Sequence, residues 1–269
     1  MELTVMNGIK TEPLLSIITI CLNSRSTIER AIESVVGQKQ ARVEYIIVDG
    51  GSTDGTQDVV RKYGSIVDIF ISEPDQGISD GFNKGIALAR GEVICLLNAD
   101  DSLLPGSIQK VLDFFRNNHN GQVLHGDLLL YRDNKLVKRV APAGRWWYPW
   151  RLVLFNHPAT FVKRSVYAKH GIFDLDYSIA MDIEIFLRWM TSGVRIDYLQ
   201  EPLVAMYFGG LSDRRPYDGY REARRAYIAH GFPYLPVTLL FVTKCLLHHF
   251  GKLHATLLSH LRNISDDKS

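Results

Sequence analysis

Two adjacent carboxylates follow an apolar run in the first half of the sequence. The run Val93–Leu97 has the composition of a buried strand, and the segment NADD that follows it places Asp100 and Asp101 where the strand ends. Neighbouring carboxylates repel each other and stay ionised only beside a cation or a hydrogen-bond network. Mg²⁺ and Mn²⁺ are commonly held by one or two protein carboxylates together with substrate phosphates. The pair therefore predicts a divalent-metal site, and a capped start to a helix near Pro105 is the alternative.

A second polar loop follows another apolar strand. The segment VDGGSTDGT (48–56) comes directly after the run Tyr45–Val48, and its three glycines allow tight backbone turns. Asp49 stands at the end of the strand, where its carboxylate can accept hydrogen bonds from a ligand. An ordinary turn that caps the next helix is the alternative. The dinucleotide fingerprint GxGxxG is absent, which argues against a nicotinamide enzyme.

The elements that must position these loops alternate between strands and helices. Apolar β-branched runs predict strands and helical spacing of apolar residues predicts helices; the strands are expected at 16–22, 45–48, 67–71 and 93–97, and the helices at 26–36, 56–63 and 79–89. Such alternation builds a parallel sheet flanked by helices, whose ligands bind at the carboxyl ends of the strands. Later segments predict a mixed sheet, with a hairpin at 122–140, a helix at 178–190 and a β-like stretch at 194–208.

The composition is that of a packed globular chain. Of 269 residues, 46% are apolar and 22% charged, which excludes a disordered chain and a disulfide scaffold. A formal charge of +2 gives no reason to expect nucleic acid as a partner. The three cysteines have no CxxC spacing, and two of them lie inside apolar runs, which is typical of buried thiols in a reducing compartment. The first residues lack the apolar core of a signal peptide, so we expect the chain to be cytoplasmic.

The C-terminal part of the chain has a different character. We expect residues 1–222 to form one α/β domain and residues 223–269 a helical basic tail, which holds six basic and two acidic residues. Apolar residues of the tail recur at steps of three and four, as in Leu239, Val242, Leu246 and Phe250. This pattern predicts an amphipathic helix suited to an anionic membrane surface, and packing on the body or on a second copy as a homodimer is the alternative. No apolar stretch is long enough to predict a spanning helix.

Several segments together resemble family 2 glycosyltransferases of the GT-A fold, in the branch that builds bacterial surface polysaccharides. They cover most of residues 14–210 and are SIITICLNS (16–24), IIVDGGSTDGT (46–56), EPDQGISDGFNKGIALARGEVICLLNADD (73–101), HPATFVKRSVY (157–167) and IAMDIEIFLRW (179–189). The first three are highly specific in combination. The resemblance implies a Rossmann-like mixed sheet flanked by helices. It also implies an inverting, metal-dependent enzyme that moves a sugar from a nucleoside diphosphate donor, expected to be uridine-linked, to a saccharide or lipid-linked acceptor.

The resemblance also implies roles for residues of the donor site. Asp49 would contact the nucleotide base, and the family's DXD element is Asn98-Ala99-Asp100 here. Asn98 would reach the ribose, and Asp100 would ligate Mn²⁺ or Mg²⁺ with support from Asp101. Because the first carboxylate of the element is an amide, one negative charge is missing from the metal site. The resemblance places two further residues beside the donor, for which a purely structural role in a helix is the alternative: Asp80 and Asn83.

The family supplies its general base from an acidic motif at the start of a helix, which by that match is Asp182. A helix N-terminal acid is the alternative reading, and Glu184 is a weaker candidate for the base. His157 begins the strand HPATF and would contact the acceptor, or else serve as a structural hydrogen-bonding residue. Aromatic and basic residues add further expectations: Trp146 and Trp147 would stack on a sugar or pack beneath a loop, and Arg214 and Arg215 would bind the diphosphate or lie on the surface.

Two other functions share the predicted nucleotide site. A sugar-phosphate nucleotidyltransferase would use the same kind of sheet and metal, but it would release pyrophosphate. A non-catalytic module would bind the nucleotide sugar without turnover, and Asn98 in place of a carboxylate is the feature that suggests it.

Overall fold

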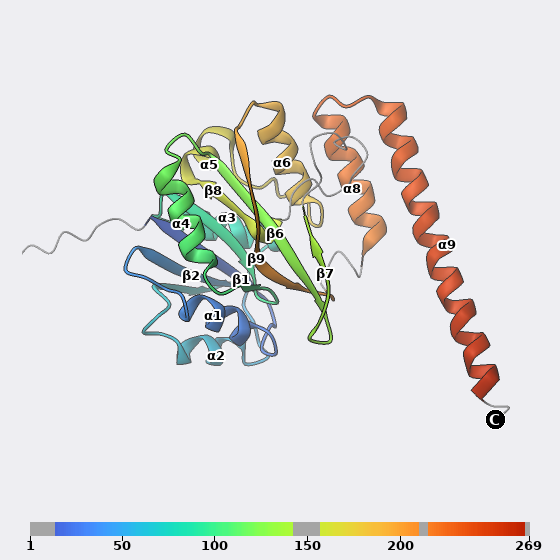
Figure 1. Cartoon of the computed structure of the whole chain (residues 1–269), viewed down its shortest axis with the longest axis horizontal. Helices are drawn as coiled ribbons and strands as arrows, with labels where there is room; N and C mark the ends of the chain where they lie inside the picture. The colour runs from blue at the N-terminus through green and yellow to red at the C-terminus, as the bar shows by residue number, and fades with distance from the viewer. Residues whose placement is uncertain (1–13, 142–156, 210–214, 267–269) are drawn as a thin grey trace, which may run out of the picture.

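The computed structural model describes residues 14–141, 157–209 and 215–266, with side chains up to residue 250 (Figure 1). Within these residues one sheet runs in the order β3-β2-β1-β4-β8-β6-β9-β5, and β7 pairs with β6. The strands are β1 (Leu15–Cys21), β2 (Val43–Asp49), β3 (Ile69–Ser72), β4 (Val93–Asn98), β5 (Ser102–Leu103), β6 (Val123–Arg132), β7 (Lys135–Val140), β8 (Thr160–Lys163) and β9 (Ile196–Tyr207).

The first four strands are parallel, and β1 lies between β2 and β4. In this register Cys21 lies opposite Asp49, and the preceding residue Ile20 lies opposite Asn98. The carboxyl ends of β2 and β4 therefore meet at one edge of the sheet, as the sequence predicts. β8 then pairs antiparallel with β4 and with β6, so the prediction of a mixed sheet is confirmed.

Helices cover both faces of the sheet (Figure 1). Alternate side chains of each strand point to opposite faces: Ile17 and Ile47 pack with one buried cluster, and Ile18 and Ile46 with the other. The first cluster includes residues of α1 (Ile28–Val36), α2 (Thr56–Lys62) and α4 (Ser107–Asn117). The second includes residues of α3 (Ile78–Leu88), α5 (Arg164–His170), α6 (Met181–Thr191), α8 (Pro216–Ala229) and α9 (Tyr234–Asp266).

The start of the predicted HPATF strand is different in the structure. Residues His157–Ala159 form a 3₁₀ turn, η2, and β8 begins only at Thr160. Pro158 has no N–H to donate to a sheet ladder, which explains why the ladder begins after it.

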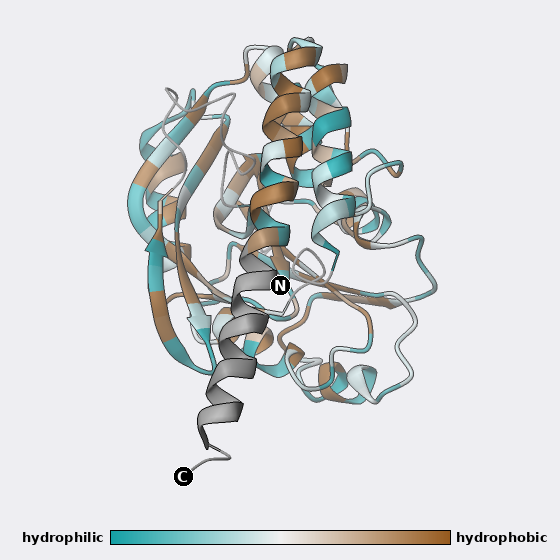
Figure 2. Ribbon diagram, turned by 90° about the vertical axis from the view of Figure 1, so that its right-hand side faces the viewer, coloured by the Kyte–Doolittle hydropathy of each residue, from teal (hydrophilic) through white to brown (hydrophobic). Residues whose placement is uncertain are grey.

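The predicted helical tail is present as α9, together with the second half of α8. The proposed boundary after residue 222 falls inside α8, and the two helices share one core with α6 through buried Ala223, Tyr227, Val237 and Phe241. Figure 2 shows α9 in front of the body, with apolar residues on its outward side. No helix in the described part of the chain combines the length and apolar content needed to cross a membrane.

Candidate functional site

The loop after β2 is fastened to the loop after β1. Ser52 Oγ accepts a hydrogen bond of 2.7 Å from the backbone N–H of Asn23, and Asn23 Oδ1 accepts one of 3.0 Å from Thr53. One residue further, the hydroxyl of Thr56 accepts a hydrogen bond of 2.8 Å from Ser24. Polar short side chains of this kind satisfy backbone groups that have no partner in a sheet or helix. Both loops are therefore held in place at the carboxyl edge of the sheet.

The side chain of Asp49 holds the loop after β2 in place. Its side chain is fully buried, and its carboxylate accepts hydrogen bonds from the Ser52 N–H at 3.0 Å and from the Ser72 hydroxyl at 2.6 Å. The Ser52 hydroxyl donates to the same carboxylate. These contacts join the ends of β2 and β3, and they occupy the carboxylate oxygens for which the family resemblance implies a contact with the nucleotide base. A direct contact between Asp49 and the base stays a prediction.

Asp75 is a site residue that the sequence reasoning did not single out. Its carboxylate lies against Gly50, so closely that a Cβ atom at position 50 would be 2.5 Å from Asp75 Oδ2. Asp75 Oδ1 accepts a hydrogen bond of 2.9 Å from Gly77, which fixes the carboxylate over the loop after β2. Its place in the sequence could have indicated this role, because Asp75 follows β3 closely, as Asp49 stands at the end of β2. The acidic side chain beside Gly50 is thus supplied by the loop after the neighbouring strand, β3.

The Asn98–Asp101 segment forms a compact turn after β4. The Asn98 side-chain amide donates a hydrogen bond of 3.0 Å to Asp101, whose carboxylate also receives the backbone N–H of Tyr207. Asp101 is buried, whereas Asp100 is partly exposed. Burial, followed by the charge of Asp100, raises the pKa of Asp101 to about 8. The structure therefore brings the predicted metal ligands together with the amide that replaces the first carboxylate.

Arg30, from α1, is a second residue that the sequence reasoning missed. Its guanidinium donates a hydrogen bond of 2.7 Å to the carbonyl oxygen of Asp100, and it lies 3.5 Å from the centre of the Tyr207 ring. Its Nε atom is buried without a hydrogen-bond partner among the described residues. A cation held behind two carboxylates lowers their mutual repulsion. Arg30 is isolated in the sequence from every polar loop, so only the fold reveals this contact.

The turn after β4 fits a hard divalent cation in its donor chemistry. Two carboxylates and an amide are the oxygen ligands that Mg²⁺ and Mn²⁺ accept, and sites for these ions often take their remaining ligands from substrate phosphates and water. The described residues contain no cluster of three or more His, Cys, Asp or Glu side chains that could hold a metal by themselves. A metal at Asp100 and Asp101 would therefore depend on ligands from the substrate.

Asp182 occupies the second position of α6. Its side chain is largely buried, and burial raises its pKa to about 6, although the backbone N–H of Ile183 donates a hydrogen bond of 2.8 Å to Oδ1. A carboxyl group with a pKa near the working pH can both accept a proton and release it. The weaker candidate, Glu184, is buried in an ion pair with Arg188 and contacts His230 at 3.1 Å. Glu184 therefore has a structural set of partners.

The loop before α6 is joined to α3. Asn83 donates to the carbonyl of Phe173 and accepts from its N–H, both at 2.9 Å, and Ser79 donates to the carbonyl of Tyr177 at 2.9 Å. Because α3 begins just after β3, these bonds bring the start of α6 towards the carboxyl edge of the sheet. The amide of Asn83 is engaged in this pairing, and Asp80 accepts from the N–H of Gln76 at 3.0 Å. Contacts of either residue with a donor stay predictions.

His157 lies where α3 and α6 meet. Its ring packs against Phe82, Phe173 and Phe186, and burial lowers its pKa to about 4, so it is neutral at physiological pH. Its Nε2 is buried and has no hydrogen-bond partner in the described part of the chain. Among the described residues the ring is held by aromatic packing, and its predicted contact with the acceptor stays a prediction.

Four of the predicted site residues remain, two arginines and two tryptophans. Arg215, the residue before α8, forms an ion pair of 2.8 Å with Asp218 of that helix, and half of its side chain is exposed. Trp146, Trp147 and Arg214 lie outside the described residues.

Taken together, one edge of the sheet carries an acidic turn suited to a cation and two fastened polar loops, and the helix joined to α3 begins with a carboxyl group of raised pKa. The first two features suit a phosphate-bearing ligand, and the third suits proton transfer. Such an arrangement can bind a phosphorylated substrate and deprotonate a nucleophile.

Comparison with known sequences gives a consistent picture. A family model described as "Glycosyl transferase family 2" matches residues 16–165. A "PGL/p-HBAD biosynthesis glycosyltransferase" of Mycobacterium bovis is 29% identical over 213 residues, which cover 75% of this chain and 80% of the relative. An "Uncharacterized glycosyltransferase" of Mycobacterium tuberculosis is 33% identical over 186 residues, which cover 65% of this chain and 68% of the relative.

Solved structures share the fold. TarS 1–349 of S. aureus in complex with UDP-GlcNAc has a TM-score of 0.64 at 16% identity, over 84% of this chain and 70% of that one. The mannosyltransferase PcManGT of Pyrobaculum calidifontis, in complex with GDP-Man and Mn²⁺, has a TM-score of 0.64 at 17% identity, over 88% of this chain and 70% of that one. The present chain spans 43% of the longer TarS chain.

Proposed function

Because the chain belongs to glycosyltransferase family 2, we propose that it transfers a sugar from a nucleoside diphosphate donor, with inversion at the anomeric carbon, during polysaccharide biosynthesis. The observation that carries the proposal is the acidic turn at Asn98–Asp101, which lies at the carboxyl edge where ligands of such sheets bind. The related structures with UDP-GlcNAc and with GDP-Man support a nucleotide sugar as the donor class. We propose a uridine-linked donor.

The donor diphosphate would meet the turn after β4. Asp100, with Asp101 beside it, would hold Mn²⁺ or Mg²⁺, and the bound metal would neutralise the charge of the leaving diphosphate. Asn98 would donate to or accept from the ribose, and Arg30 would keep the backbone of Asp100 in place. The loop over Gly50 and Asp75 would border the nucleotide base, with Asp49 keeping that loop in shape.

Asp182 would remove the proton from the acceptor hydroxyl. Attack from the face opposite the diphosphate requires a base on the acceptor side, and a carboxylate with a pKa of about 6 is ionised at neutral pH yet basic enough to take the proton. The aromatic residues around His157 would form the wall beside this acceptor position. Oriented binding of donor and acceptor would supply the rest of the rate enhancement.

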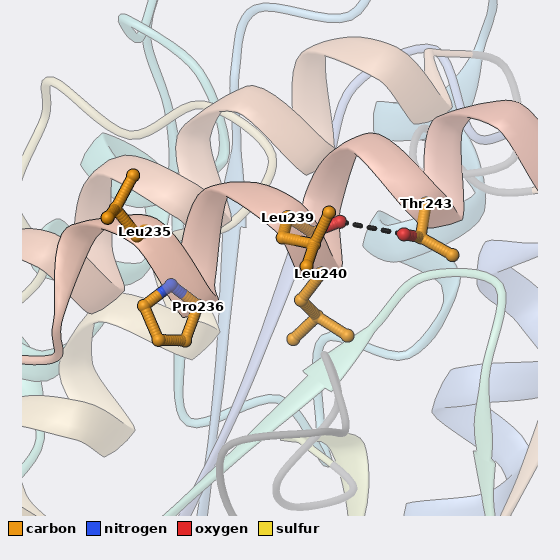
Figure 3. A pocket seen from close by; sticks show the side chains of 5 residues that line it. All are labelled: Leu235, Pro236, Leu239, Leu240 and Thr243. Atoms are coloured by element: carbon orange, nitrogen blue, oxygen red, sulfur yellow. Dashed lines mark hydrogen bonds between the residues drawn. The ribbon is translucent and has the colours of Figure 1, made fainter.

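The acceptor would be a saccharide on a lipid carrier, reached at the inner membrane surface from the cytoplasm. The outward face of α9 supports this proposal, because its side chains are exposed and apolar: Leu235 is 77% exposed, Leu239 68% and Leu247 67%. A shallow hollow along the helix is lined by Leu235, Pro236, Leu239, Leu240 and Thr243 (Figure 3). The sequence from 223 to 265 has no acidic residue, and Arg224 lies over the Tyr234 ring at 4.9 Å. An apolar face with basic and aromatic neighbours suits anionic lipid.

A donor panel tests the proposed reaction. The full chain is incubated with Mn²⁺, a lipid-linked saccharide acceptor and one donor at a time. The donors are UDP-GlcNAc, UDP-Glc, UDP-Gal and GDP-Man, and the released nucleotide is identified. Release of a nucleoside diphosphate with glycosylated product supports the glycosyltransferase. Release of pyrophosphate from UTP and a sugar phosphate supports a nucleotidyltransferase, and tight donor binding without turnover supports a non-catalytic module. Either of these two results contradicts the proposal.

A further inference from the structure

The loop that leads into α6 is held by hydrogen bonds to a carboxylate of α8. Glu222 Oε2 accepts three backbone hydrogen bonds, from Ser178 at 3.0 Å, Ile179 at 2.8 Å and Ala180 at 2.9 Å. Glu222 Oε1 accepts a fourth, from the Ser178 hydroxyl at 2.7 Å. Both oxygens of one side chain are thus committed to three consecutive residues.

This contact satisfies three backbone N–H groups in the segment just before α6, a helix that has no side-chain cap of its own. Ala180 is the N-cap residue of α6 and its side chain cannot accept a hydrogen bond, so no side-chain cap is present at this helix start. Buried backbone N–H groups need partners, and a carboxylate near a helix N-terminus also interacts favourably with the helix dipole. Asp182 lies two residues beyond Ala180, so the hydrogen bonds to Glu222 fix the backbone from which α6 and that carboxyl group begin.

A second side chain of α8 holds the same loop. Arg225, one helical turn after Glu222, donates to the carbonyl oxygen of Asp176, and its guanidinium lies 4.0 Å from the centre of the Tyr177 ring. On the other side, Ser79 of α3 donates to the carbonyl of Tyr177. The segment before Asp182 is therefore held between α3, at the donor side, and α8, at the tail side.

The hydrogen bonds also keep Glu222 ionised. Burial by itself would raise the pKa of this carboxyl group, but the four donors outweigh burial and hold its pKa below the ordinary value. The Glu222 carboxylate therefore stays charged at neutral pH.

On the basis of the proposed function, we infer that Glu222 is a positioning residue for the reaction, which holds the first turn of α6 so that Asp182 meets the acceptor hydroxyl. Glu222 lies at the C-terminal edge of the proposed catalytic domain, on the helix that also packs against α9. The position of the proposed base is thus fixed by the part of the chain that carries the tail.

The first test is amide hydrogen exchange of the full chain, compared between the wild type and Glu222→Ala. If Glu222 holds the loop, exchange at Ile179 and Ala180 becomes at least about tenfold faster, because each amide loses its acceptor. Exchange in β1, far from the loop, serves as the internal reference. Unchanged exchange at Ile179 and Ala180 in the folded variant would overturn the inference.

The second test separates positioning from general stability. Glu222→Ala should lower kcat by about tenfold or more, as small misplacements of reacting groups do, while the dissociation constant of UDP with Mn²⁺ changes less than about threefold. Glu222→Asp, which keeps the charge on a shorter side chain, should recover part of the loss. Glu201→Gln is the matched control, since Glu201 is a half-exposed surface carboxylate paired with Lys110. Equal loss of kcat in this control, or no recovery by Glu222→Asp, would argue against a specific role.

A double-mutant cycle with Asp182→Asn completes the design. If Glu222 acts through Asp182, Glu222→Ala costs less than about threefold in the Asp182→Asn background. An equal cost in both backgrounds would overturn the inference while leaving the proposed function intact. If Asp182→Asn turns over like the wild type, the proposed base is wrong, and hydrogen exchange still decides whether Glu222 holds the loop. Should Glu222→Ala fail to fold, Glu222→Gln, which keeps one acceptor oxygen, takes its place in each test.

Discussion

The side-chain amide of Asn98 donates a hydrogen bond of 3.0 Å to the buried carboxylate of Asp101. The sequence shows this position only as an acidic motif that lacks one charge. In the fold the amide supplies a donor to a carboxyl group whose pKa is raised to about 8, first by burial and then by the charge of Asp100. An amide at position 98 therefore stabilises the acidic turn in the absence of any ligand.

Replacement of Asn98 by aspartate should make the turn depend on metal. Asn98→Asp removes the donor and adds a third carboxylate, so the metal-free protein should lose about 1–3 kcal/mol of stability, and Mn²⁺ should restore more of it than in the wild type. Thermal unfolding with EDTA and with Mn²⁺ measures both effects. Asn120→Asp, at an exposed position, is the control for added charge. A metal-free variant as stable as the wild type would contradict this account of the turn.

The transfer rate should depend on pH through Asp182. Only the ionised carboxylate can accept the proton, so kcat should rise with pH through about 6 and level off above it, falling about tenfold per pH unit well below 6. The profile is measured at saturating Mn²⁺ and donor, with circular dichroism as a check that the protein stays folded. A rate that is constant from pH 7 down to pH 4.5 would exclude a group with this pKa as the base.

A methyl group at position 50 should disturb the loop that borders the proposed nucleotide site. In Gly50→Ala the new Cβ would lie 2.5 Å from Asp75 Oδ2, so the carboxylate must move, at a cost of about 1–3 kcal/mol. Urea unfolding measures this loss, and Asp75→Ala should relieve most of it in the double variant. Gly37→Ala is the control, because its Cβ would meet only the Glu33 carbonyl oxygen, at 3.5 Å. If the two glycine variants are equally stable, Asp75 does not press on Gly50.

The outward face of α9 should bind anionic vesicles. Leu246→Asp places a charge on this face and should weaken binding of the full chain to phosphatidylglycerol-containing vesicles by about tenfold or more, without loss of stability. Leu136→Asp, at a leucine of similar exposure on β7, should bind as the wild type does. Substitution is preferable to deletion of the tail, because Val237 and Phe241 belong to the core. If Leu246→Asp instead converts a dimer to a monomer and leaves vesicle binding unchanged, the face joins two copies of the chain.

The sequence predicts the sheet well because its strands are continuous buried runs. β1, β2 and β4 lie within two residues of the predicted ranges, and the ends of β2 and β4 identify Asp49 and the Asn98–Asp101 turn. A strand that is buried on both faces needs apolar side chains at successive positions. Such a strand can therefore be recognised from a short stretch of sequence alone.

Contacts between distant segments could not be predicted in this way. Arg30 reaches the backbone of Asp100 across 70 positions, and Glu222 reaches Ala180 across 42. Their partners are backbone atoms, which are the same in every residue and leave no trace in the sequence. Asn83 shows the converse, because its type and place suggested a ligand contact while the fold gives its amide to Phe173.

The central claim is that Asp182 is the base of a glycosyl transfer. Isothermal titration of UDP with Mn²⁺ and measurement of kcat, both on Asp182→Asn, test it most directly. The account predicts a dissociation constant within about threefold of the wild type and a kcat lower by about 10²-fold or more, the usual scale for loss of a general base. Turnover close to that of the wild type in this variant would contradict it.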